Sequence, residues 1–99
     1  MNPDDAFESV ARDALGVAGV TRRMMFGRDT LLADGQPFAF RQGDRVALKL
    51  PSAAEVVASG EGTLPRMGKR VMRQWVAVPL VVSPELTERV DAARRFVDR

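Results

Sequence analysis

Residues 30–50 decide the fold, and they read TLLADGQPFAFRQGDRVALKL. Two dipeptides typical of tight turns, Asp34-Gly35 and Gly43-Asp44, divide this stretch into three short runs. Asp-Gly favours a type I′ turn, because both central residues of that turn need a positive φ. Apolar and other residues then alternate over residues 45–50, so we expect one face of this strand in the core and the other, with Ala47, in solvent. The stretch therefore predicts consecutive antiparallel hairpins.

Further strands flank this stretch on both sides. Residues 22–26 and 30–33 form extended runs on either side of Gly27, which leaves two interpretations: one strand interrupted near the glycine, or two strands separated by a bend. We expect three strands between residues 21 and 50. Residues 71–78 are rich in β-branched and aromatic side chains and predict the last strand. A proline makes residues 64–69 an irregular segment or a poor edge strand.

Three helices are predicted from capping residues and apolar spacing. Asn2, followed by a proline and two aspartates, starts a helix over residues 3–15. A serine and a glutamate at capping-box spacing predict a short helix over residues 53–59. Ser83 repeats the pattern of cap, proline and acid, and it starts a C-terminal helix whose apolar residues recur at helical spacing.

The expected order of elements is helix, three strands, helix, one or two strands, helix. This order predicts a two-layer α+β fold with a curved antiparallel sheet of four to five strands and helices at the N-terminus, in the middle and at the C-terminus. A chain of 99 residues has the size of one domain, and smaller pieces would bury too little surface to fold. We therefore expect a single domain over residues 1–99.

Cysteine and histidine are both absent from the chain. Their absence removes disulfides, thiolate nucleophiles, histidine-based catalysis and the commonest metal ligands. We therefore expect a protein that is not an enzyme, with no cofactor, no metal and no small-molecule substrate. An enzyme would require a cleft that holds Lys49 or Lys69 beside a carboxylate of perturbed pKa.

The N-terminus and the apolar runs indicate where the protein acts. Residues 1–5 include two aspartates, whereas a secretory signal would begin with positive charge. The longest apolar runs, residues 46–50 and 76–82, are far shorter than the roughly 20 residues of a membrane span. We expect a cytoplasmic protein that does not contact a membrane.

Basic residues gather in two places. Residues 62–84 contain no acid and carry four cations among methionines and a tryptophan, and residues 22–28 carry three arginines around Met-Met-Phe-Gly. As a binding surface, the two groups would hold a phosphate backbone and stack a base. As ordinary structure, the cations are solvated and the tryptophan is the largest core residue. The candidate residues for a nucleic-acid or partner surface are Arg22, Arg23, Arg28, Arg66, Lys69, Arg70, Arg73 and Trp75.

Several short motifs follow one another in a characteristic order along most of the chain. They are Met25-Phe26-Gly27, Asp34-Gly35, Phe38-Ala39, Leu48-Lys49, Gly60, Pro65, Gly68-Lys69, Met72, Trp75 and Val78-Pro79. With this ordered set, which spans residue 20 to the C-terminal helix, the chain resembles the TfoX N-terminal domain and is similar to the related YjbR group. The resemblance implies an α+β fold like that of secretion chaperones. It also implies a link to bacterial competence regulation through the longer TfoX/Sxy proteins, and it supplies no catalytic residues.

Two hypotheses for function follow. The first is a non-enzymatic regulatory domain of the TfoX N-terminal type that stands alone, without the second TfoX domain. It would bind another protein, or a second copy of itself as a homodimer, through a sheet edge or a helix face. The alternative is a nucleic-acid-binding module that uses the basic loop and hairpin. The methionines are expected mainly in the core, although methionine-rich surfaces also suit adaptable protein contacts. The sequence does not identify the protein partner.

Overall fold

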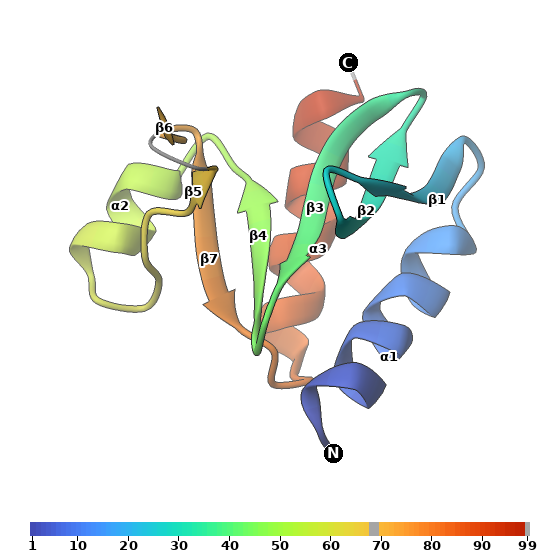
Figure 1. Ribbon diagram of the computed structural model, residues 1–99, viewed down its shortest axis with the longest axis horizontal. Helices are drawn as coiled ribbons and strands as arrows, with labels where there is room; N and C mark the ends of the chain where they lie inside the picture. Colours follow the sequence, from blue (N-terminus) through green and yellow to red (C-terminus); the bar gives the residue numbers. More distant parts are fainter. Residues whose placement is uncertain (68–69, 99) are drawn as a thin grey trace.

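The computed structural model of the chain describes residues 1–67 and 70–98. It confirms the α+β fold, with an antiparallel five-stranded sheet in the order β1-β2-β3-β4-β7 and helices at the N-terminus, in the middle and at the C-terminus (Figure 1). A two-stranded ribbon of β5 and β6 stands apart from this sheet. The elements are α1 (Pro3–Leu15), β1 (Val20–Met25), β2 (Arg28–Ala33), β3 (Gln36–Gln42), β4 (Arg45–Lys49), α2 (Ala53–Ala58), β5 (Arg66–Met67), β6 (Arg70–Val71), β7 (Trp75–Pro79) and α3 (Pro84–Val97).

The first block holds four strands, so the count of three was wrong, and of the two interpretations at Gly27 the structure confirms two strands separated by a bend. β1 and β2 pair along their whole length, from Val20 opposite Ala33 to Met25 opposite Arg28. Phe26 and Gly27 form the turn between them, with φ of 53° and 73°. Two successive positive φ values are the signature of a type I′ turn, so Gly27 closes a hairpin and is not a bulge within one strand. The pairing between β2 and β3 instead shifts register between Leu31 and Leu32.

The last strand is shorter than the predicted residues 71–78. β7 begins at Trp75, because the preceding residues belong to a turn in which the Trp75 amide donates to the Met72 carbonyl at 3.2 Å. The Met72 amide in turn donates to the Pro65 carbonyl at 3.2 Å. The chain before residue 75 is thus drawn away from the main sheet into the β5–β6 ribbon.

The helix caps follow the sequence at the two long helices but not at the short one. The Asn2 side chain accepts a hydrogen bond from the Asp5 amide at 2.8 Å, and Ser83 accepts one from the Leu86 amide at 3.1 Å. The predicted capping box at α2 does not form, because the Ser52 side chain makes no capping bond. The helix starts as expected at Ala53 and ends one residue early, at Ala58.

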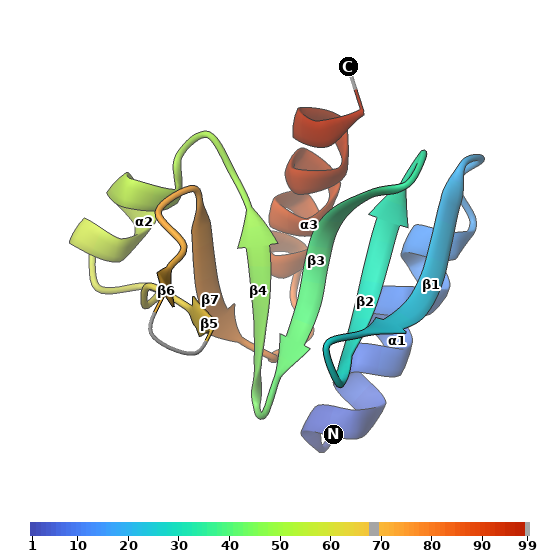
Figure 2. The same ribbon diagram turned by 45° about the horizontal axis from the view of Figure 1, so that its top comes forward.

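The main core lies between the sheet and the two long helices. Figure 2 shows α1 and α3 behind the sheet, with α2 beside β7. Phe7 on α1 is 1% exposed, and Phe38 on β3 is fully buried. Leu86 and Val90 of α3 complete this layer with the inward side chains of β2, β4 and β7. The two long helices thus occupy one face of the sheet and leave its other face to different contacts.

The opposite face of the sheet is also partly packed, so the expectation that Ala47 faces solvent was wrong. Ala47 is fully buried and lies in register between Phe40 of β3 and Ala77 of β7. The rings of Phe40 and Trp75 lie with centroids 5.1 Å apart, although β4 separates their strands. The rings therefore meet across β4, where the methyl group of Ala47 is small enough to lie beneath them. This contact closes a small second apolar layer.

Candidate nucleic-acid interface

The strand register sorts the sheet residues into two faces. Side chains alternate along a strand, and residues opposite one another on neighbouring strands share a face. The row Arg23, Thr30, Phe40, Ala47, Ala77 runs across all five strands on the side away from α1 and α3. We call this side the second face; its cationic and aromatic side chains are Arg23, Arg28, Phe40, Arg45, Lys49 and Trp75.

A continuous track of one cation and two aromatic rings crosses this face. The guanidinium carbon of Arg28 lies 5.6 Å from the centroid of Phe40, a distance at which the cation is attracted to the ring. The Phe40 and Trp75 rings are tilted by 52°, within the range that aromatic pairs prefer. Phe40 is 4% exposed, whereas Trp75 is only partly buried. The tryptophan is therefore not the central core residue that its size suggested, and part of it remains accessible on the second face.

The cations of the second face lack acidic partners. Ion pairs engage Arg22, Arg41, Arg89, Arg94 and Arg95. Across the described residues, no carboxylate forms an ion pair with Arg23, Arg28, Arg45 or Lys49. Arg45 makes one long bond of 3.5 Å to the Ala77 carbonyl. These cations are consequently available to an anionic ligand.

Arg22 differs from the other candidates because its side chain forms ion pairs within the fold. Its guanidinium bonds Asp29 of β2 at 2.6 Å and Glu8 of α1 at 2.6 Å, and it stacks over the Phe7 ring at 5.5 Å. The two carboxylates, Asp29 first, raise the pKa of Arg22, and the bond from Arg22 lowers the pKa of Glu8. Arg22 thus joins α1 to the first hairpin, and its bonds to these carboxylates already use four of its five N–H donors.

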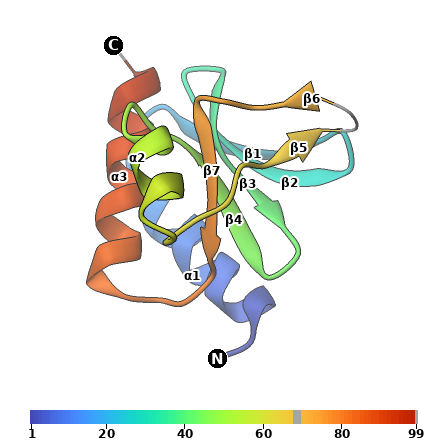
Figure 3. The same ribbon diagram turned by 90° about the vertical axis from the view of Figure 1, so that its left-hand side faces the viewer.

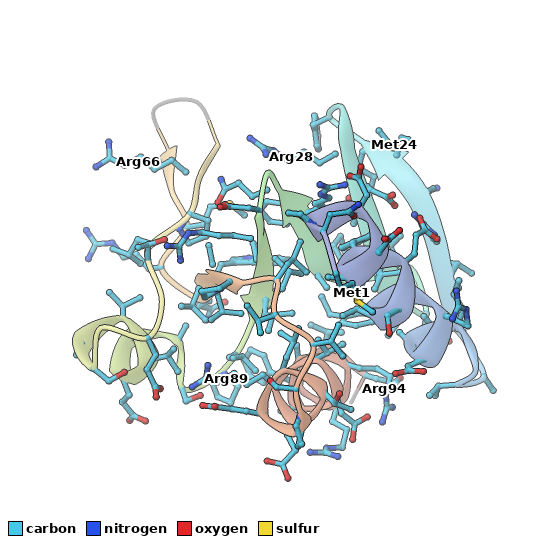
Figure 4. The ribbon with its side chains drawn as sticks, turned by 90° about the horizontal axis from the view of Figure 1, so that it is seen from below. Met1, Met24, Arg28, Arg66, Arg89 and Arg94 are labelled. Carbon is cyan, nitrogen blue, oxygen red and sulfur yellow. The ribbon has the colours of Figure 1, made fainter. Side chains whose placement is uncertain are left out.

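The second basic group lies beside the same face. Figure 3 shows the β5–β6 ribbon on the side of β7 opposite α3, and Figure 4 shows Arg66 and Arg28 on the far side of the sheet from Arg89 and Arg94. Arg66 and Arg73 are exposed, and within the described part of the chain neither forms an ion pair. Lys69 lies outside the described residues, and so does the side chain of Arg70.

Three contributors to this surface were absent from the predicted set. Arg45, Lys49 and Phe40 join it because the two Asp/Gly turns fix the register of β3 and β4. The alternation over residues 45–50 put Arg45 and Lys49 on one side of a strand, but their nearness to Trp75 depends on the pairing of β4 with β7. That pairing joins segments separated by α2 and by the ribbon, so no local sequence pattern predicts it.

The cavity on the helix side has a different chemistry. It measures about 210 Å³ between α1 and α3, with Val10, Phe38 and Leu86 in its walls. Among the described residues that line it are three carboxylates and one cation, Arg94, which bonds Asp91 at 2.8 Å and lowers the pKa of that carboxyl. An anion would be repelled here. The carboxylates that line this cavity are Asp13, Glu88 and Asp91.

Other site types find little support among the residues that the structure describes. Within them, no group of three or more acidic side chains is arranged to hold a metal ion. Lys49, one of the two lysines considered for catalysis, forms no ion pair with a described carboxylate. No helix of the described chain is both long enough and apolar enough to cross a membrane.

The methionines are less buried than expected. Met24 is 64% exposed, and Met25 and Met72 are partly buried, while the side chain of Met67 lies outside the described part. The neighbouring Phe26 is 81% exposed at the tip of the first hairpin. An apolar tip therefore adjoins the basic face.

The sequence matches no protein-family model and no curated protein.

Proposed function

We propose that the chain is a non-enzymatic regulatory binding domain of the TfoX N-terminal type whose ligand is nucleic acid, held on the second face. The observation that carries this proposal is the distribution of ion pairs. Arginines packed against α1 and on α3 are neutralised by carboxylates, whereas the four cations of the second face have no such partner among the described residues. The small net charge of +2 conceals this asymmetry, because the acids are concentrated elsewhere.

Phosphate is an anion that fits this surface. Arginine presents a planar fork of donors that matches phosphate, and binding releases counterions from a nucleic acid. For single strands, log K falls with log salt at a slope of about 0.7 for each phosphate neutralised. Contacts from the four sheet cations therefore predict a slope of about −3. Arg66 and Arg73, on or near the ribbon, would steepen it.

The test is binding of fluorescein-labelled DNA, measured by anisotropy at several salt concentrations. Arg28→Gln removes a cation from the second face, and Arg95→Gln removes one from an exposed position on α3. We expect the first substitution to weaken binding and to flatten the salt slope by about 0.7. The matched second substitution changes net charge equally and should leave both quantities nearly unchanged. Equal effects of the two, or no binding at low salt, would refute the proposal.

A protein partner is the second candidate, and the first hairpin favours it. Phe26 is 81% exposed and has a φ of 53°, a conformation that asparagine or glycine adopts at lower cost. Neither burial nor local backbone preference explains a phenylalanine at this position. β1 is also the end strand of the sheet, so its outer edge could pair with a second copy.

Self-association through this edge is tested by light scattering on a sizing column. A dimer of the native chain that becomes a monomer on Phe26→Asn would support the second candidate. A native monomer at high concentration would remove the homodimer and leave only a different protein as the partner of this tip.

A further inference from the structure

We infer that the nucleic acid bound on the second face is single-stranded and that one of its bases stacks on Trp75. This inference rests on the proposed function and specifies its ligand. A base within a duplex has both of its faces covered by its neighbours, so only an unpaired strand can offer a base to an aromatic side chain. The accessible tryptophan among the cations is therefore the feature that favours a single strand over a duplex.

The surroundings of Trp75 fit a stacking platform. Phe40 is nearly inaccessible and supports Trp75 from within the sheet at 5.1 Å. The ring is thus held by a neighbour on one side while part of its surface remains exposed. Lys49 lies opposite Trp75 in the register of β4 and β7. A base on the ring would accordingly have a cation at the adjacent strand position to receive its phosphate.

The distance across the face sets the length of strand that it can hold. The Arg28 guanidinium carbon lies 5.6 Å from the Phe40 centroid, which lies 5.1 Å from the Trp75 centroid, so the cation and the indole ring are at most about 11 Å apart. RNA-binding sheets of similar width stack two or three bases. We therefore expect a core site of about two to three nucleotides, with Arg28 and Trp75 near its two ends.

The face should discriminate little between base sequences. Every base has a stackable surface, and sequence readout needs polar groups directed at base edges. Thr30 is the buried polar residue of this face, and its hydroxyl already donates to the Arg28 carbonyl at 3.0 Å. The chemistry that the face recognises is shared by single-stranded DNA and RNA, and the experiment must distinguish them.

Trp75 is itself the probe, because the chain has one tryptophan and no tyrosine. The native protein is titrated with four ligands while tryptophan emission is recorded: an oligothymidine, an oligouridine of equal length, a DNA duplex and inorganic polyphosphate. We expect both single strands to quench the emission. Unequal affinity of the two would name the preferred source. Polyphosphate should bind without quenching, and the duplex should bind more weakly than either single strand.

Two substitutions separate stacking from charge. Trp75→Phe retains an aromatic surface and should keep most of the affinity, whereas Trp75→Ala should lower affinity for oligothymidine by about tenfold or more and leave affinity for polyphosphate unchanged. The quenching titration of the native protein tests the stacked base even if a variant fails to fold. Binding of all anions with unchanged emission would overturn the stacked base but preserve the basic interface. Equal quenching by the duplex would overturn the single strand, and absence of any binding would overturn the proposed function as well.

Discussion

Replacing Ala47 with leucine tests the packing of the second face. Ala47 has no exposed area, and the rings of Phe40 and Trp75 meet across its strand. A leucine here adds three carbons to a filled layer, which costs about 1–3 kcal/mol. It also separates the two rings, whose contact contributes about 0.5–1.5 kcal/mol. The two effects together predict a loss of about 1.5–4.5 kcal/mol of unfolding free energy.

The assay is thermal unfolding followed by circular dichroism, with tryptophan emission of the folded state measured alongside. At roughly 4–8 °C per kcal/mol for a domain of this size, a loss of about 2 kcal/mol lowers the Tm by about 8–16 °C. We expect the emission maximum of folded Ala47→Leu to shift to the red, because Trp75 loses its contact with Phe40. Ala47→Gly is the control: it weakens the strand by about 0.5–1 kcal/mol and leaves the rings together. An Ala47→Leu variant with native stability and native emission would refute this packing.

Three further substitutions have expected outcomes in thermal unfolding. Asp34→Asn should raise the Tm at pH 7, because the hydrogen bond and charge of Asp98 raise the pKa of Asp34 above its usual 3.8, and stability falls as pH rises through the raised value. The gain in Tm should vanish below pH 3, where both carboxyls are protonated, and a gain that persists there would contradict the carboxyl pair. Gly62→Ala should destabilise by about 1–3 kcal/mol, since its Cβ would lie 2.4 Å from a Val76 methyl carbon; a native Tm would contradict this tight contact. Phe26→Asn should stabilise by about 1 kcal/mol by relieving the positive φ, and a lower Tm would indicate that Phe26 supports the fold.

Local patterns were sufficient to predict the features whose causes are local. Asp34-Gly35 turns the chain as expected, with φ of 49° and 82°. The Asn2 cap and the whole first helix also follow from neighbouring residues. The Phe26-Gly27 turn was missed as a hairpin because phenylalanine seldom adopts a positive φ. The local signal there pointed to an extended residue followed by a flexible one.

The remaining features depend on contacts between distant segments. Arg22 looked like a surface cation because its partners, Glu8 and Asp29, come from a helix and a neighbouring strand. Trp75 looked like a core residue because size favours burial, but the β4–β7 register places it on the second face. The basic interface exists only once that register joins residues from β1 to β7. Sequence patterns could name many of its residues but could not separate those paired in the fold from those left free.

The most direct test of the central claim is amide chemical-shift mapping by NMR. The labelled native protein is titrated with a short oligothymidine at low salt. We predict that the largest shifts fall on β2, β4 and β7, around Arg28, Lys49 and Trp75, with the indole signal of Trp75 among them. Shifts confined to the α1–α3 cavity, or none at saturating oligonucleotide, would contradict the assignment of the second face as the nucleic-acid interface.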